Sequence, residues 1–137
     1  MEISIFEFYD YKVYINTRLQ FLPGKGYGFK AQIARAAGCN SAYVTQVLNK
    51  NAHFSLEQAE ALNSLLSHDR DEAEYFLSIV QYARANSKAL RDRFKIQIER
   101  IKQARLSYKV RLDIRHELSE PDQVRYYSSW YFAAIHM

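Results

Sequence analysis

The 137-residue sequence predicts an all-α protein, on three observations. Glycine occurs four times and proline twice, while residues with high helix propensity, such as Ala, Leu, Glu, Lys, Arg and Gln, are frequent. Asn-Gly and Asp-Gly turns between alternating apolar and polar residues, which would predict β-hairpins, do not occur in the sequence. Hydrophobic residues make up 48% of the chain, so it can bury the core of one or two small domains.

The first helix is expected to begin at Ser4, because Ser4 and Glu7 have the spacing of a capping box. One face of this helix then carries Phe8, Tyr11, Ile15 and Leu19. Pro23 and the three glycines between residues 24 and 28 are expected to end it, since proline and glycine interrupt helices.

A short helix, a tight turn and a second short helix are predicted over residues 29–50. The first of these helices, Phe29–Ala37, is followed by Gly38, which can supply the positive φ angle of a C-terminal turn. Asn40 is expected to cap the next helix, from Ser41 to about Lys50. The inward face of that helix carries Val44, Val47 and Leu48, and the more exposed face carries Ser41, Ala42, Tyr43, Thr45, Gln46 and Asn49.

Two further helices complete a predicted five-helix bundle, which we place in a first domain of residues 1–86. The segment Ser55–Gln58 has capping-box spacing and predicts a helix that continues to about residue 66. The segment Asp69–Glu72 has the same spacing and predicts a fifth helix to about residue 85.

Residues 87–118 are predicted to form one long basic helix that connects the bundle to the rest of the chain. Helix breakers are few between Lys88 and Glu117. Apolar residues recur there in steps of four and three, namely Phe94, Ile98, Ile101, Tyr108 and Leu112, although Arg105 interrupts the series. Residues 108–118 have an extended alternative, because Val110, Leu112 and Ile114 alternate with polar residues as in a strand.

Residues 119–137 are expected to begin a C-terminal region with an aromatic-rich helix. The segment Ser119-Glu120-Pro121 has the composition of a helix start. The aromatic residues of the region are Tyr126, Tyr127, Trp130, Tyr131 and Phe132. We prefer a core or interdomain contact over a ligand pocket as their role. The sequence stops inside this apolar run, which predicts that the chain is the N-terminal part of a longer protein.

The helix-turn-helix predicted at residues 29–50 is typical of proteins that read double-stranded DNA with the second helix in the major groove. Ala34 and Gly38 would allow the close helix contact and the tight turn that this motif needs. The predicted DNA contacts are Ser41, Ala42, Tyr43 and Gln46 on base edges, Lys30, Arg35, Asn49 and Lys50 on phosphates, and Thr45 beside them. The same pattern also occurs in helical bundles that bind no nucleic acid.

Basic charge is concentrated in the predicted long helix. Residues 1–60 hold six Lys or Arg and five Asp or Glu, a net charge of +1, whereas residues 88–117 hold ten and four, a net charge of +6. Every seventh residue of this helix is a lysine, and we call the set Lys88, Lys95, Lys102 and Lys109 the lysine stripe. The stripe could supply accessory phosphate contacts, but a solvated flank whose stems cover apolar surface is the preferred interpretation. A two-stranded homodimer through this helix is not favoured, because acidic partners for the stripe are missing across the apolar face.

The remaining candidates for chemistry do not form a site in the sequence. Cys39 is the single cysteine, and His53, His68, His116 and His136 lack metal-ligand spacing. A phosphate-binding glycine loop and a nucleophile elbow are also missing. We therefore expect no enzyme, no metal and no cofactor. The sequence lacks a signal peptide and an apolar run of the about 20 residues that span a bilayer, so a cytoplasmic protein without a membrane partner is expected.

Four segments of the sequence carry a resemblance to a known family. They are Ile5-Phe6-Glu7-Phe8-Tyr9-Asp10-Tyr11, Ile33-Ala34-Arg35-Ala36-Ala37-Gly38, Asp71-Glu72-Ala73-Glu74-Tyr75-Phe76 and Tyr126-Tyr127-Ser128-Ser129-Trp130-Tyr131. Over essentially its whole length, the chain resembles the N-terminal half of a bacterial family of transcriptional regulators that is expanded in predatory bacteria. The resemblance implies a repressor-like (Cro/lambda-repressor-type) helix-turn-helix region followed by a C-terminal domain of unknown function. Lys30 and Leu48 differ from the glutamine and the glutamate that repressor-like domains often have at these places.

The sequence thus predicts a DNA-binding transcriptional regulator domain that reads the major groove with residues 41–50. A homodimer is expected, because a single reader with a near-neutral charge would bind DNA weakly. The alternative is a protein-interaction module that keeps the helix-turn-helix shape, binds no specific DNA sequence and holds a protein partner through its tyrosine-rich surfaces. The missing C-terminal domain is a further expected partner.

Overall fold

The computed structural model of the chain describes residues 3–26 and 28–118, without the side chains of 25, 113 and 115–118. All regular elements in this part of the chain are helices, which confirms the all-α class. The elements are two 3-10 helices, η1 (Ile5–Glu7) and η2 (Pro23–Gly26), and six α-helices, α1 (Tyr11–Gln20), α2 (Phe29–Ala37), α3 (Ser41–Asn49), α4 (Leu56–Leu65), α5 (Arg70–Arg84) and α6 (Lys88–Leu118). The chain divides into two compact units, Met1–Ile101 and Lys102–Met137, and the division falls within α6.

The N-terminal segment differs from the prediction that the first helix begins at Ser4. The Ser4 side chain caps only the short η1, where its oxygen accepts a hydrogen bond from the Phe6 N–H. Phe8 then takes an extended conformation, and α1 begins after Asp10, whose carboxylate accepts bonds from the Lys12 and Val13 N–H groups. Serine and aspartate are comparable N-cap residues, so the later start follows from the extended backbone of Phe8, which ends η1 and separates it from α1.

The turn between α2 and α3 has the predicted geometry. Gly38 adopts a φ angle of 75°, and its N–H donates to the Arg35 carbonyl at 3.3 Å. The Cys39 N–H donates to the Ala34 carbonyl at 2.9 Å, so the two bonds form a Schellman motif. The Asn40 side chain caps α3, as predicted, by accepting from the Tyr43 N–H.

The starts of α4 and α5 are also confirmed. Both predicted capping boxes are complete, Ser55 with Gln58 and Asp69 with Glu72. Helix α6 runs from Lys88 to Leu118, so the extended alternative for residues 108–118 is wrong. The predicted final helix and the aromatic group of residues 126–132 lie outside the described residues. Within the described residues, every helix is too short or too polar to cross a membrane.

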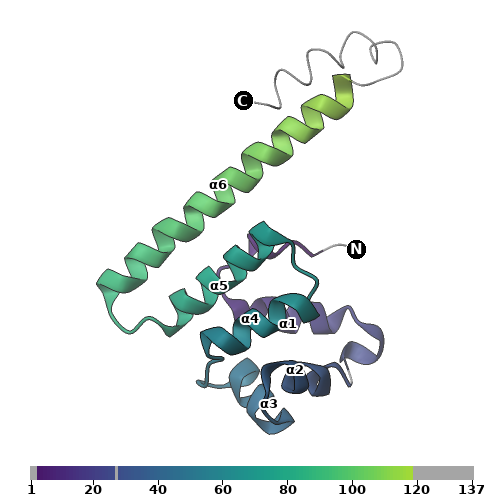
Figure 1. Cartoon of the computed structure of the whole chain (residues 1–137), viewed down its shortest axis with the longest axis vertical. Coiled ribbons are helices and arrows are strands. Elements are labelled where there is room, and N and C mark those ends of the chain that lie inside the picture. The colour runs from purple at the N-terminus through teal and green to yellow at the C-terminus, as the bar shows by residue number, and fades with distance from the viewer. Residues whose placement is uncertain (1–2, 27, 119–137) are drawn as a thin grey trace. The chain divides into compact units, whose positions relative to one another are not determined.

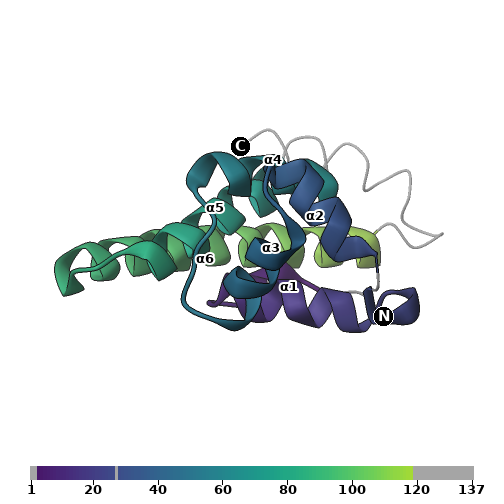
Figure 2. The same cartoon turned by 90° about the horizontal axis from the view of Figure 1, so that it is seen from below.

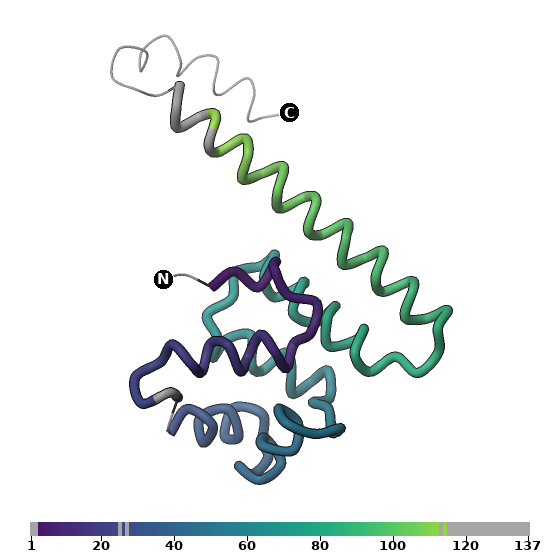
Figure 3. The backbone as a smooth tube through the Cα atoms, turned by 180° about the vertical axis from the view of Figure 1, so that it is seen from behind, coloured from purple at the N-terminus to yellow at the C-terminus, as the bar shows by residue number. Residues whose placement is uncertain are grey.

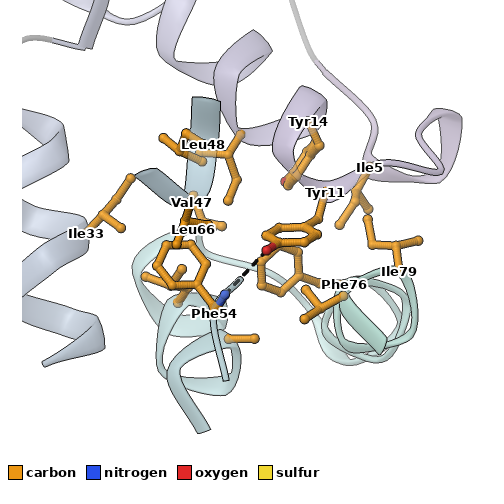
Figure 4. Packing of buried hydrophobic residues seen from close by; sticks show 14 of the residues in the cluster. Ile5, Tyr11, Tyr14, Ile33, Val47, Leu48, Phe54, Leu66, Phe76 and Ile79 are labelled. Carbon is orange, nitrogen blue, oxygen red and sulfur yellow. Dashed lines mark hydrogen bonds between the residues drawn. The ribbon is translucent and has the colours of Figure 1, made fainter. Parts of the chain in front are cut away.

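The core of the first unit draws on every helix around it. Figure 4 shows side chains from η1, α1, α2, α3 and α5 together with Phe54 and Leu66, and Tyr11 and Phe54 are fully buried. Helix α4 contributes Ala59 and Leu62 to the same core. Ile98 of α6 is fully buried in the same cluster, which fixes the first part of α6 to the bundle. Figures 1 and 3 show α2 and α3 at the end of the unit opposite α5, and Figure 2 views the unit from that end.

Ser67, which follows α4, is the one non-glycine residue with a positive φ among those described, at 59°. The Ser67 N–H donates to the Ser64 carbonyl and the His68 N–H to the Asn63 carbonyl, so α4 ends in a second Schellman motif. We expect Ser67→Gly to stabilise the fold by about 0.5 kcal/mol, because the left-handed strain removed exceeds the added entropy of the unfolded chain. Thermal unfolding followed by circular dichroism would measure this. The control Ser64→Gly, inside α4, should destabilise by a similar amount, and a loss of stability in Ser67→Gly would contradict the account.

Candidate nucleic-acid interface

One face of α3 is buried and the other is polar and accessible. Val44, Val47 and Leu48 lie in the core, as the spacing predicted. The predicted contact residues that are exposed are Ser41, Ala42, Gln46, Asn49 and Lys50 on or next to α3, and Arg35 on α2. The predicted contact residues that are half-buried are Lys30, Tyr43 and Thr45. Because α2 and α3 contact each other and are joined by a tight turn, these side chains belong to one end of the unit (Figure 2).

Tyr43 anchors α3 to the segment that follows it. Its ring packs against the core, and its hydroxyl donates a hydrogen bond of 2.7 Å to the His53 carbonyl. The phenolic hydrogen is therefore already used inside the protein. Of the residues predicted at base edges, this leaves Ser41, Ala42 and Gln46 with exposed side chains.

Side chains of α1 satisfy the backbone carbonyls at the C-terminal end of α3. The Lys12 ammonium donates to the carbonyls of Lys50, at 2.6 Å, and Ala52, at 2.8 Å. The Asn16 amide donates to the Leu48 carbonyl at 3.1 Å. The last carbonyls of a helix have no partner within the helix, so these bonds fix the end of α3 against α1. No sequence pattern predicts this role, because the partners are 32 to 40 residues apart.

A second group of contacts holds the segment between α3 and α4, residues 50–55. The Phe54 N–H donates to the Tyr11 oxygen (Figure 4), and the Tyr11 hydroxyl lies 2.9 Å from Nδ1 of His53. Arg84 of α5 donates to the Phe54 carbonyl at 2.9 Å. Burial, and then the positive charges of Lys12 and Arg84, lower the pKa of His53, so the neutral ring can accept the Tyr11 hydrogen. Burial raises the pKa of Tyr11, which keeps the phenol protonated.

The helices at this end of the unit come from a segment without acidic residues. Residues 11–56, which contain α1, α2 and α3, hold no Asp or Glu in 46 positions. The same segment has six basic residues, for a net charge of +6, namely Lys12, Arg18, Lys25, Lys30, Arg35 and Lys50. Residues 1–60 together have a net charge of only +1, because this longer range includes three carboxylates before the segment and two after it. Counting charge by predicted helix would have found the difference.

Acidic residues follow immediately in the next two helices. Residues 57–74 hold six Asp or Glu and one Arg, a net charge of −5. They belong to α4, to the start of α5 and to the turn between them. The first unit is therefore electrically polarised along the sequence, with α1 to α3 basic and the α4–α5 segment acidic.

Two members of the lysine stripe lie in the first unit and have partners there. The Lys88 ammonium forms an ion pair of 2.9 Å with Asp92. The Lys95 ammonium lies 5.1 Å from the centroid of the Tyr9 ring, and the Tyr9 hydroxyl donates to Glu99 at 2.6 Å. In the second unit, Lys102 is half-buried and Lys109 is exposed.

Among residues 3–26 and 28–118, no group of three or more His, Cys, Asp or Glu side chains could hold a metal ion. Cys39 is half-buried, and burial raises the pKa of its thiol. Comparisons with models of protein families, with curated proteins and with solved structures found no match for the chain. Its function must therefore be inferred from its own residues and geometry.

Proposed function

We propose that the chain is a DNA-binding regulatory domain that inserts α3 into the major groove. The observation that supports this most is the polar, exposed face of α3 within a 46-residue segment that has six basic and no acidic residues. Phosphate neutralisation supplies much of the affinity of DNA-binding proteins, and carboxylates near the groove would oppose it.

The exposed side chains of α3 match the chemistry of base edges. Gln46 can pair in a bidentate manner with adenine, and the Ala42 methyl can contact the methyl group of thymine. Ser41, at the first position of the helix, can bond to a base or a phosphate. The proposed phosphate contacts are Arg35 on α2 and Lys50 at the end of α3, with Lys30 of α2 as a half-buried third cation.

The proposal includes a homodimer, in which two such domains bind two half-sites of the DNA. One short reading helix with about three phosphate contacts binds weakly, and dimers on two half-sites are the usual solution in helix-turn-helix proteins. A role in bacterial transcription is part of the proposal, on the resemblance of the sequence to a family of regulators. Exposed Lys109 could add a phosphate contact in the second unit.

Selection from a random-sequence DNA pool at two salt concentrations would test the proposal. We expect a paired motif to be enriched, with binding that weakens as salt rises. Gln46→Ala should weaken binding to the selected site by about 1–3 kcal/mol and should remove the base preference at one position of the motif. The matched control is Gln97→Ala, an exposed glutamine of α6, which should leave the selected motif unchanged. Salt-sensitive binding without any enriched motif would overturn sequence-specific reading.

A protein-interaction module is the second candidate, and exposed apolar residues on α6 favour it. Ile96 is 59% exposed, and in the second unit Leu106 is 55% and Val110 is 48% exposed. Leu106 and Val110 are four residues apart on the same helix face, and exposed apolar residues that are neighbours often mark a surface that binds another protein. If this function is the main one, the chain should bind DNA at neither salt concentration, and Gln46→Ala should have no effect.

A further inference from the structure

Arg84 connects the end of α5 to the segment that follows the reading helix. It is the last residue of α5, where a basic side chain commonly bonds to carbonyls of its own helix. The Arg84 guanidinium instead crosses to the Phe54 carbonyl, 30 residues away in the sequence, at 2.9 Å. The next carbonyl, of Ala85, accepts a bond of 3.3 Å from Arg91 in the first turn of α6. Two consecutive residues at the α5–α6 junction therefore bond to other parts of the unit, Arg84 to residue 54 and Ala85 to α6.

Phe54 is the point where these contacts converge on the core. Its side chain is fully buried, its N–H donates to Tyr11 of α1, and its carbonyl accepts from Arg84 of α5. The preceding carbonyl, of His53, accepts from Tyr43 of α3. Two successive peptide groups outside the helices are therefore held by α3 and α5. Through them, the position of α3 is tied to the end of α5.

We infer that Arg84 is a positioning residue for the reading helix, and that the α5–α6 junction can thereby control sequence reading by α3. The inference rests on the proposed DNA-binding function. Base recognition requires side chains to be held within a fraction of an ångström, whereas phosphate contacts tolerate more movement. Loss of the Arg84 bond would therefore reduce sequence selectivity more than general affinity for DNA. A partner that displaces α6 would act on the same bond through Ala85.

The test compares Arg84→Gln with Arg93→Gln, which removes the same charge from an exposed position on α6. Hydrogen exchange measured by mass spectrometry would follow peptides that cover residues 50–55. We expect exchange there to rise about tenfold in Arg84→Gln and to stay unchanged in Arg93→Gln, because one charged hydrogen bond is lost only in the first. DNA selection should show selectivity reduced about tenfold in Arg84→Gln, with affinity for random DNA equal to that of Arg93→Gln.

Arg84→Lys keeps the charge and a donor at this position, and it should restore most of the selectivity. If Arg84→Gln does not fold, Arg84→Lys is the variant to measure. Its hydrogen exchange over residues 50–55 should rise above that of the wild type, but by less than tenfold. If hydrogen exchange over residues 50–55 is the same in these variants as in the wild type, the Arg84–Phe54 bond does not hold the segment. The proposed DNA binding by the wild-type chain would not be affected by that result. If Arg84→Gln exchanges faster over residues 50–55 but selects DNA sequences as well as Arg93→Gln does, the positioning role is overturned. A wild-type chain that selects no DNA sequence would overturn the proposed function and, with it, the control of reading.

Discussion

Replacing Phe76 with alanine should lower the free energy of unfolding by about 3–5 kcal/mol, because the substitution leaves a cavity at the centre of the bundle. Phe76 is fully buried in α5. Its ring centroid lies 6.3 Å from those of Tyr11 and Tyr14 and 5.4 Å from that of His68. Domains of this size have total stabilities of about 5–15 kcal/mol, so the variant should be partly unfolded at physiological temperature.

Urea denaturation followed by circular dichroism would measure this effect. The matched control is Phe21→Ala, because Phe21 follows α1 and is 59% exposed. Its loss should change the stability by less than about 0.5 kcal/mol. Similar losses of stability for the two phenylalanines would contradict the core described above.

A fall in pH from 7 to 4 should destabilise the fold by about 2–3 kcal/mol through His68 alone. The Asn63 amide donates to Glu60 at 3.0 Å, so the Asn63 oxygen faces Nδ1 of His68, at 2.7 Å. Nδ1 therefore carries the hydrogen, and Nε2 accepts from the Tyr14 hydroxyl at 2.7 Å. The Tyr14 oxygen accepts in turn from Arg18 at 2.9 Å. Protonation of His68 would place a second positive charge beside this arginine.

Burial, and then the charge of Arg18, lower the pKa of His68 from 6.5 to about 4, against a smaller opposing effect of Asp69. The unfolded chain therefore binds a proton at His68 more readily than the folded chain does. Stability from this group is complete above pH 6.5 and is lost as the pH falls through 4. A shift of this size corresponds to about 3 kcal/mol, less a correction for partial exposure to solvent.

Urea midpoints at several pH values, for the wild type and for His68→Gln, would separate this effect from that of the carboxylates. The glutamine variant should be less stable at pH 7 and should lose about 2 kcal/mol less than the wild type on acidification. Parallel stability curves for the two proteins would show that His68 does not titrate as the structure implies.

Local patterns were sufficient to place most helices, because their determinants lie within four residues of one another. Gly38, Asn40 and the capping boxes at Ser55 and Asp69 each act on neighbouring peptide groups, so spacing alone revealed them. The start of α1 was wrong for the same reason, since Ser4 and Asp10 are both valid local caps. Which of them begins the longer helix depends on the packing of the residues between them.

The candidate interface was predicted in part. Spacing separated the buried residues Val44 and Val47 from exposed Gln46, because a helix places every third or fourth residue on the same face. The hydroxyl of Tyr43 could have faced DNA or the protein, and only its partner, the His53 carbonyl, decides between them. The basic character of α1 to α3 is present in the sequence, but the net charge of residues 1–60 does not show it, because acidic residues flank these helices.

The amino-acid sequence was enough for the helical class, for the caps and for the face that each helix buries, since all of these follow from short-range spacing and propensity. The folded chain alone reveals that Lys12, Asn16 and Arg84 bond to the end of α3 and to the segment after it, and that His68 is a half-buried base whose pKa is lowered. These contacts join residues that are 30 to 54 positions apart. Long-range contacts of this kind arise only when helices pack, because packing places a backbone carbonyl beside a side chain that no local pattern connects with it.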